Sequence, residues 1–180
     1  LLDFSMEDHR GHLNQADIDW LRTELHDFEI AASSPGDPSI QLTRYLTFYQ
    51  LPAAAIDVQL ISGRSADRQT LILAWKPRVS RGTAIVVHGY MDHIGLYNHL
   101  VEHLLQQQLT VVCFDLIGHG LSSGDTGSIN NFGQYVAQLE QVISLAKKHF
   151  PGPIHGIGQS MGGAILLNHL INQTDNQQYP

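Results

Sequence analysis

The chain has 180 residues, 43% of them hydrophobic and 15% charged, which fits one globular domain and excludes a disordered or collagen-like protein. Its formal net charge of -7 argues against nucleic acid as a partner, because proteins that bind a phosphate backbone carry basic patches. No apolar run is long enough to cross a bilayer. Cys113 is the single cysteine, so no internal disulfide can form, and a cytoplasmic location is expected.

The first 45 residues are expected to form a helical extension and linker, and residues 46–180 the main domain. A helix is predicted from Asn14, whose side chain can cap it. Residues 31–39 contain two prolines and a glycine and are expected to form the linker. The apolar positions of the predicted helix recur at helical spacing and are Ile18, Leu21, Leu25 and Phe28.

A strand pair is predicted next. Residues 56–61 and 70–75 are apolar or β-branched runs, and Ser62-Gly63-Arg64 between them predicts the turn. Pro77 is expected to end the second strand. Residues 84–87 are continuously apolar, which is typical of a strand buried on both faces of a mostly parallel sheet.

Helices and strands then alternate. A helix is predicted over residues 97–105, a strand over 110–114, and a long helix that Ser128 caps and Pro151 ends. A last strand leads into Ser160, and a helix follows it. An antiparallel pair followed by this alternation predicts an open, mostly parallel α/β sheet with helices on both faces.

The segment Gly156–Gly163 contains the strongest functional signal. Gly158, Ser160 and Gly162 fit G-x-S-x-G, in which the serine lies on a sharp turn between strand and helix with its hydroxyl exposed above the sheet. The turn crowds the positions two before and two after the serine, so only very small residues fit there. We therefore predict that Ser160 is a nucleophile with strained backbone angles. The turn also places the N–H of Met161 at a helix start, where it can face an oxyanion.

Two other patterns compete with this interpretation. The glycines before the serine come close to the dinucleotide-binding G-x-G-x-x-G, but its third glycine would have to replace Met161, and Asp175 follows a helix rather than the required strand. The stretch from His99 to His103 matches the zinc-protease pattern H-x-x-E-H. Its histidines are predicted to face solvent without a third ligand, so neither a metal nor a cofactor is expected.

Three ordered motifs resemble the α/β-hydrolase family, and especially its lysophospholipase and monoacylglycerol-lipase branch, which also resembles the proline iminopeptidases. They are V-V-H-G-Y at 86–90, F-D-L-I-G-H-G-L-S at 114–122 and the serine motif at 158–163. The likeness extends over roughly residues 56–172. The family usually has histidine before its serine, where this chain has Gln159.

The resemblance implies an α/β-hydrolase fold whose active site lies where the strands end. Tyr90, which follows His88-Gly89, would supply one oxyanion amide and Met161 the other. His88, Gly89 and Asp115 are expected on the rim of the active site. Asp115 is interpreted as a partner of local backbone amides and not as the catalytic acid.

In this fold the acid and the histidine of the triad follow the serine. Only 20 residues follow Ser160, and Asp175 among them falls in a predicted polar loop from Thr174 to Pro180. His169 lies on the helix of Ser160 and is predicted to point away from it. We therefore expect a chain truncated after the nucleophile helix, and also missing its natural start because it begins at Leu1.

The resemblance implies a serine hydrolase that acts by acyl transfer on a lysophospholipid or monoacylglycerol. A lipid or ester substrate is the expected partner, together with peripheral contact with a membrane. Three alternatives stay open: a peptidase of the proline-iminopeptidase type, a hydrolase of small esters, and a catalytically inactive binding protein.

Overall fold

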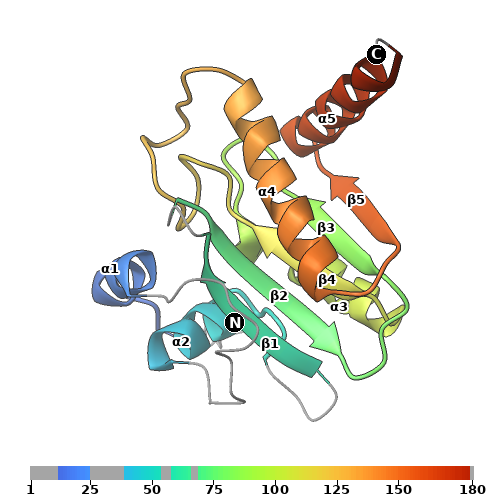
Figure 1. The fold of residues 1–180 in the computed structure, drawn as a ribbon. Helices are drawn as coiled ribbons and strands as arrows, with labels where there is room; N and C mark the ends of the chain where they lie inside the picture. The colour runs from blue at the N-terminus through green and yellow to red at the C-terminus, as the bar shows by residue number, and fades with distance from the viewer. Residues whose placement is uncertain (1–11, 25–38, 54–57, 66–68, 179–180) are drawn as a thin grey trace, which may run out of the picture.

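In the part of the chain that the structure describes, five strands form one sheet in the order β1-β2-β4-β3-β5 (Figure 1). The computed structural model describes residues 12–24, 39–53, 58–65 and 69–178, with side chains to residue 173. β1 pairs antiparallel with β2 and β2 with β4, whereas β3 lies parallel to both β4 and β5. The predicted antiparallel start and parallel continuation are therefore confirmed. The strands are β1 (Val58–Arg64), β2 (Leu71–Pro77), β3 (Thr83–Val87), β4 (Thr110–Phe114) and β5 (Ile154–Gly158).

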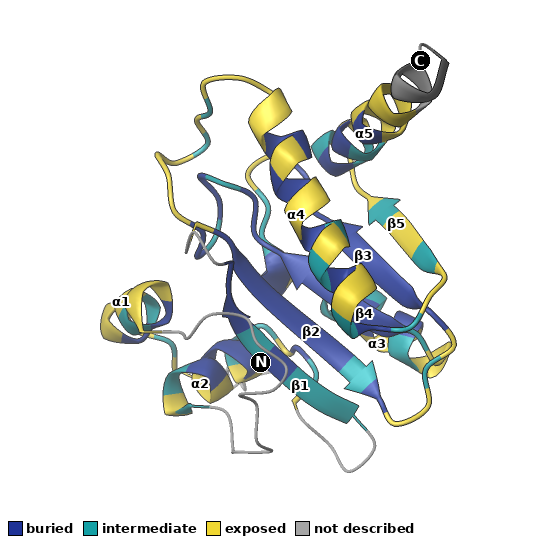
Figure 2. Ribbon diagram, in the orientation of Figure 1, coloured by how far each residue is buried: buried dark blue, intermediate teal, exposed yellow. Residues whose placement is uncertain are grey.

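Helices cover both faces of the sheet, as predicted (Figure 2). Val111 and Cys113 of β4 point into a core shared with α1, α2 and α3, and the alternate residues Val112 and Phe114 point into a core shared with α4 and α5. No helix of the described ranges has both the length and the apolar composition to span a membrane. The helices are α1 (Gln15–Thr23), α2 (Ile40–Phe48), the short 3₁₀ helix η1 (Ile94–Tyr97), α3 (Asn98–Gln106), α4 (Gly133–His149) and α5 (Met161–Gln178).

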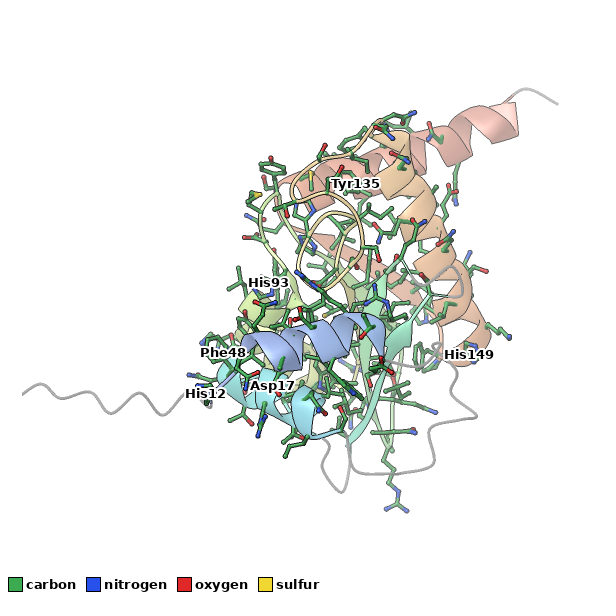
Figure 3. All side chains as sticks on the ribbon, turned by 90° about the vertical axis from the view of Figure 1, so that its left-hand side faces the viewer. His12, Asp17, Phe48, His93, Tyr135 and His149 are labelled. Atoms are coloured by element: carbon green, nitrogen blue, oxygen red, sulfur yellow. The ribbon has the colours of Figure 1, made fainter. Side chains whose placement is uncertain are left out.

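Among the residues that the structure describes, two helices precede the sheet, and only the first is predicted from the sequence. Asn14 caps α1 as expected: its side chain accepts from the backbone N–H of Asp17, and Asp17 accepts in return from that of Asn14. α1 lies across α2, to which the buried Asp17 is tied by a 2.8 Å ion pair with Arg44 (Figure 3). The boundary proposed between residues 45 and 46 stays a prediction and falls inside α2. Leu25, Phe28 and most of the expected linker lie outside the described residues.

Three predicted element boundaries are wrong. Ser62-Gly63-Arg64 is not a turn, because all three residues pair with β2 and continue β1. The turn comes after Ser65, whose N–H donates to the carbonyl of Thr70 at 2.9 Å. Ser128 does not cap α4, because its own N–H closes a tight turn onto Asp125 and the helix begins at Gly133.

The third wrong boundary concerns the end of the chain. α5 continues to Gln178, so Asp175 lies in a helix and not in a polar loop. A solvent-facing helix can be polar on most of its surface, so the polarity of residues 174–180 does not by itself predict that the helix has ended.

The register brings three strand ends to one edge of the sheet. Val87, the last residue of β3, pairs with Phe114 of β4 on one side and with Gly158 of β5 on the other. The residues that follow these strands therefore share one rim. As predicted, this rim carries His88 after β3, Asp115 after β4 and Ser160 after β5.

Candidate active site

Ser160 occupies a turn between the end of β5 at Gly158 and the start of α5 at Met161. Its φ is 50°, in the left-handed region that L-residues rarely adopt, and Ser160 is exposed. The predicted strain at the serine is confirmed. Such strain in a residue that a rigid strand and helix hold from both sides is a feature of functional sites.

The two glycines of the elbow are required by close backbone approaches. A Cβ on Gly158 would lie 2.5 Å from the carbonyl carbon of Gly162, within the elbow itself. A Cβ on Gly162 would overlap the carbonyl oxygen of Val87 and lie 2.7 Å from that of His88. Gly162 thus allows the first turn of α5 to touch the end of β3. This second reason for a glycine at position 162 cannot be seen in the sequence pattern alone.

The backbone amides of Tyr90 and Met161 both lack an acceptor within the described part of the chain. Neighbouring amides are occupied: that of Gln159 donates to Val87 O at 3.1 Å, and that of Gly162 to Gln159 O at 2.8 Å. Met161 is the first residue of α5, where the helix dipole favours a negative ligand. Two unpaired donors in the segments that follow the neighbouring strands β3 and β5 are what an oxyanion hole requires, and their shared role stays a prediction.

The side chain of Tyr90 ties this loop to the glycine-rich loop that follows β4. Its hydroxyl donates to Gly127 O at 3.2 Å. Its ring meets that of His119 edge-on, with centroids 5.6 Å apart. The backbone that carries the candidate oxyanion donor is therefore anchored through its own side chain.

His88 has a structural role at the rim. Its Nδ1 lies 2.7 Å from Gly89 O and must donate, and its Nε2 accepts from the N–H of Leu116 at 2.9 Å. Both contacts need the neutral ring, and burial lowers the pKa of His88 below its usual value of 6.5. His88 therefore holds the start of one rim loop against the start of the other.

Asp115 binds local backbone amides, as the sequence interpretation predicted. One carboxylate oxygen accepts from Ile94 N at 2.7 Å and the other from Leu121 N at 2.8 Å. The carboxylate is fully buried, and a Cβ on Gly120 would overlap it. Asp115 therefore fixes the folded shape of the rim.

His169 does not serve Ser160. Its Nδ1 lies 3.2 Å from a carboxylate oxygen of Glu140 on α4, and its Nε2 lies 3.0 Å from Nε2 of Gln173. Nine residues of helix separate it from Ser160, a rise of about 13 Å. His169 instead links α5 to α4.

The zinc alternative gains no support from the helix that carries its motif. The side chain of His99 is 89% exposed and His103 is exposed, whereas Val101 between them packs in the core. No group of three metal-ligating side chains gathers in the ranges that the structure describes. These histidines lie on the solvent-facing side of α3.

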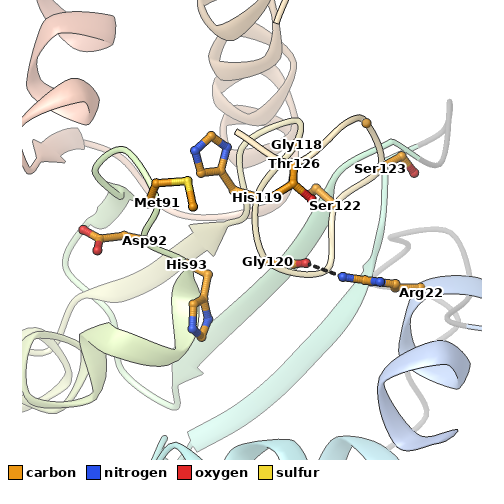
Figure 4. A pocket seen from close by; sticks show the side chains of 11 residues that line it. Arg22, Met91, Asp92, His93, Gly118, His119, Gly120, Ser122, Ser123 and Thr126 are labelled. Atoms are coloured by element: carbon orange, nitrogen blue, oxygen red, sulfur yellow. Dashed lines mark hydrogen bonds between the residues drawn. The ribbon is translucent and has the colours of Figure 1, made fainter. Parts of the chain in front are cut away.

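A pocket of about 310 Å³ opens on the same rim (Figure 4). Met91, Asp92 and His93 form one side, and the glycine-rich loop Gly118–Gly124 lines another. Arg22 of α1 completes the wall and donates to Gly120 O at 3.2 Å. Sequence reasoning missed this pocket, because its walls come from segments far apart in the chain.

Asp92 connects the pocket to the elbow. Its carboxylate accepts from the hydroxyl of Tyr97 at 3.1 Å, and that hydroxyl accepts from the N–H of Gly89 at 3.2 Å. Burial, reinforced by the charge of Asp92, raises the pKa of Tyr97 to about 12, so the phenol keeps its proton. A Cβ on Gly89 would overlap the side chain of Gln159, the neighbour of Ser160, and would lie 2.9 Å from the carboxylate of Asp92.

Residues 78–179 match the family described as serine aminopeptidase, S33. Monoglyceride lipase of Homo sapiens is 35% identical over 106 residues, which cover 57% of this chain and 35% of that protein. A monoglyceride lipase homolog of Monkeypox virus is 36% identical over 95 residues, covering 52% of this chain and 34% of its own length. A phospholipase of Bacillus subtilis is 28% identical over 99 residues, which cover 55% of this chain and 38% of that protein. The chain thus spans only 34–38% of the length of these relatives.

Among solved structures, an esterase of Pyrococcus furiosus superposes with a TM-score of 0.50 at 24% identity. The superposition covers 63% of this chain and 46% of that one. This likeness concerns the fold alone, and it confirms the predicted α/β-hydrolase architecture.

Proposed function

Because the chain belongs to the serine aminopeptidase S33 family of α/β-hydrolases, we propose that it carries the nucleophile and oxyanion hole of a serine hydrolase that cleaves carboxylic esters. The strained Ser160 at the elbow is the observation that carries this proposal. It places an exposed hydroxyl beside the unpaired amide of Met161, on the rim that also holds Tyr90. The relatives named monoglyceride lipase support a monoacyl lipid as the substrate class, and the relative named phospholipase supports a lipid ester more broadly.

In the proposed reaction, Oγ of Ser160 forms a bond to the ester carbonyl carbon while the carbonyl electron pair moves onto oxygen. The amides of Tyr90 and Met161 donate to this oxyanion, and losing one such donor typically costs about 2.7–4 kcal/mol. The proton of Ser160 passes to a histidine, which returns it to the leaving alcohol. Water then cleaves the acyl-enzyme by the same route.

Because the acid and the histidine follow the serine in the chain order of this fold, we assign both to the part of the full-length protein beyond the segment shared with the relatives. His88 and His169 are both occupied by the contacts described above. Asp115 has both carboxylate oxygens bound to amides. The relatives are about three times longer than the segment they share with this chain, which leaves room for both groups.

The test uses the full-length protein and a fluorophosphonate probe, which bonds covalently to activated serines. We expect the probe on Ser160, together with turnover of a monoacyl lipid. Ser160→Ala should lower turnover by about four to six orders of magnitude. Ser144→Ala, at an exposed serine of α4, is the matched control and should change neither readout.

Two outcomes would contradict the proposal. One is lipid turnover that survives Ser160→Ala. The other is a protein that neither takes up the probe nor hydrolyses any ester, which would favour the inactive binding protein. Faster cleavage of N-terminal residues from peptides than of esters would favour the peptidase alternative.

A further inference from the structure

The turn that carries the amide of Tyr90 is closed by one hydroxyl at both of its ends. It runs from Gly89 to Asp92, whose N–H donates to Gly89 O at 3.3 Å. The hydroxyl of Tyr97 accepts from the N–H of Gly89 at 3.2 Å and donates to the carboxylate of Asp92 at 3.1 Å. Figure 4 shows this carboxylate turned away from Arg22. A side chain of the following helix η1 therefore joins the first residue of the turn to the last.

The backbone of this turn needs such support. The side chain of Tyr90 is anchored on the glycine-rich loop, but Tyr90 and Met91 are 57% and 59% exposed, so packing holds them weakly. Met91 has a φ of 60°, a left-handed conformation that is strained in a residue other than glycine. A strained conformation persists only where the surrounding contacts enforce it. The two hydrogen bonds of the Tyr97 hydroxyl are contacts of this kind.

The hydrogen bonds of Gly89 decide where the N–H of Tyr90 points. Gly89 C=O and Tyr90 N–H belong to one planar trans peptide, so they point in opposite directions. Gly89 O is held by Nδ1 of His88 at 2.7 Å and by the N–H of Asp92. Because a glycine has little conformational preference of its own, its N–H must be held as well before the peptide that follows it is fixed. Tyr97 holds that N–H.

We propose that Tyr97 is a positioning residue of the oxyanion hole: its hydroxyl, held by Asp92, fixes Gly89 and thereby aims the N–H of Tyr90. The inference rests on the proposed ester hydrolysis, in which this N–H donates to the oxyanion. A phenol suits the position because it can accept one hydrogen bond and donate another. The carboxylate of Asp92 can only accept, so it draws the proton of Tyr97 and leaves a lone pair for the N–H of Gly89. Tyr97 thus acts through the backbone and not on the substrate.

The test uses the full-length protein and measures kcat and KM separately on a monoacylglycerol. Tyr97→Phe keeps the ring and removes the hydroxyl. It should lower kcat about ten- to a hundredfold, because a displaced donor stabilises the transition state less well, and KM should stay within about twofold. Tyr49→Phe is the matched control and should change neither constant. Tyr49 is also partly buried and its ring meets that of His93, but its hydroxyl has no hydrogen-bond partner within the described ranges.

Variants of Asp92 test the same arrangement from its other end. Asp92→Ala leaves the hydroxyl of Tyr97 without its acceptor and should lower kcat about as far as Tyr97→Phe. Asp92→Asn keeps an acceptor oxygen and should retain more of the original kcat than Asp92→Ala. Because the two side chains act as one unit, the double variant of Tyr97→Phe and Asp92→Ala should lie within about twofold of the slower single variant. Effects that multiply would overturn the inference.

Amide hydrogen exchange followed by NMR tests the contact without turnover. In the full-length Ser160→Ala protein, Tyr97→Phe should speed exchange of the Gly89 amide about tenfold and leave that of Val86 in β3 unchanged. Unchanged exchange at Gly89 overturns the inference. A kcat loss no larger than that of Tyr49→Phe, or a raised KM with kcat retained, also overturns it and leaves ester hydrolysis standing. If no ester is hydrolysed, the proposed function fails, and exchange at Gly89 then decides whether Tyr97 holds the turn.

Discussion

At the scale of single residues, the backbone strain of Ser160 can be separated from its chemistry. Its φ of 50° strains the backbone of an L-residue, and a glycine at this position would not be strained. We expect Ser160→Gly to raise the free energy of unfolding by about 0.5–1 kcal/mol. This net gain is the strain that the glycine relieves, minus the loss that comes from the greater conformational entropy of glycine in the unfolded chain. Ser160→Ala keeps the strain and should leave stability within about 0.5 kcal/mol of the original. Chemical denaturation of both variants checks this, and a Ser160→Gly protein less stable than Ser160→Ala would contradict it.

His88 predicts a dependence of stability on pH. Burial holds its pKa below 6.5 in the folded protein, so below that pH the unfolded chain binds more protons than the folded one. The stability that the neutral ring contributes is therefore present above about pH 6.5 and is lost as the pH falls below it. Protonation would turn Nε2 into a donor facing the N–H of Leu116.

The measurement compares unfolding free energies at about pH 7.5 and about pH 5.5, on either side of this range. His88→Gln should be less stable at the higher pH and should lose less on acidification. His103→Gln, at an exposed histidine of α3, should keep the original slope. An unchanged slope in His88→Gln would show that another group governs the effect.

At the scale of elements, adjacent glycines in α5 should respond in opposite ways to alanine. Gly162→Ala drives a Cβ into the backbone of Val87 and His88 and should destabilise the protein by about 1–3 kcal/mol. In Gly163→Ala the new Cβ meets its nearest atom, Gly158 O, at an ordinary 3.5 Å. Removing a glycine from a helix should then add up to about 1 kcal/mol. Thermal unfolding distinguishes the two, and equal effects would contradict the close approach of α5 to β3.

The elements that could be predicted from sequence are those with strong local signals. β3 and β4 are continuous apolar runs, and the elbow needs its glycines for local steric reasons. α2 was missed although Ser39 caps it and Leu42, Tyr45 and Leu46 recur at helical spacing, because the prolines and glycine before it suggested a linker. β1 continues through Ser62-Gly63-Arg64 because pairing with β2 outweighs the turn preference of these residues.

The candidate site could be predicted only in part. Ser160, Gly158 and Gly162 lie within one short segment, so their geometry follows from local sterics. The role of Asp115 followed from its place at a strand end. The pocket could not be predicted, because Arg22, Asp92 and His119 meet only through the packing of α1 against the rim, and no local spacing encodes that contact.

At the scale of the whole molecule, the β5 edge of the sheet is less well covered than the strands in its middle. β2, β3 and β4 are buried along most of their length, whereas β5 is half-buried or exposed throughout (Figure 2). Among the described strands, β5 pairs with β3 alone and leaves its other edge free. Beside it, α5 exposes Leu167, Leu170 and Ile171 by 58–62%. An open strand edge next to apolar side chains is a site for association between chains.

We therefore expect the 180-residue chain, expressed alone, to self-associate through β5 and α5. Replacing Leu167 and Leu170 together by lysine should remove apolar area, add charge repulsion between copies and weaken association about tenfold or more. Val79→Lys is the matched control. Val79 is an apolar residue that is 66% exposed, and it lies in the loop between β2 and β3, outside β5 and α5. Sedimentation velocity over a concentration series measures the effect. If the original chain is monomeric at all concentrations, or if Val79→Lys weakens association as much as the double variant, then β5 and α5 are not the associating surface.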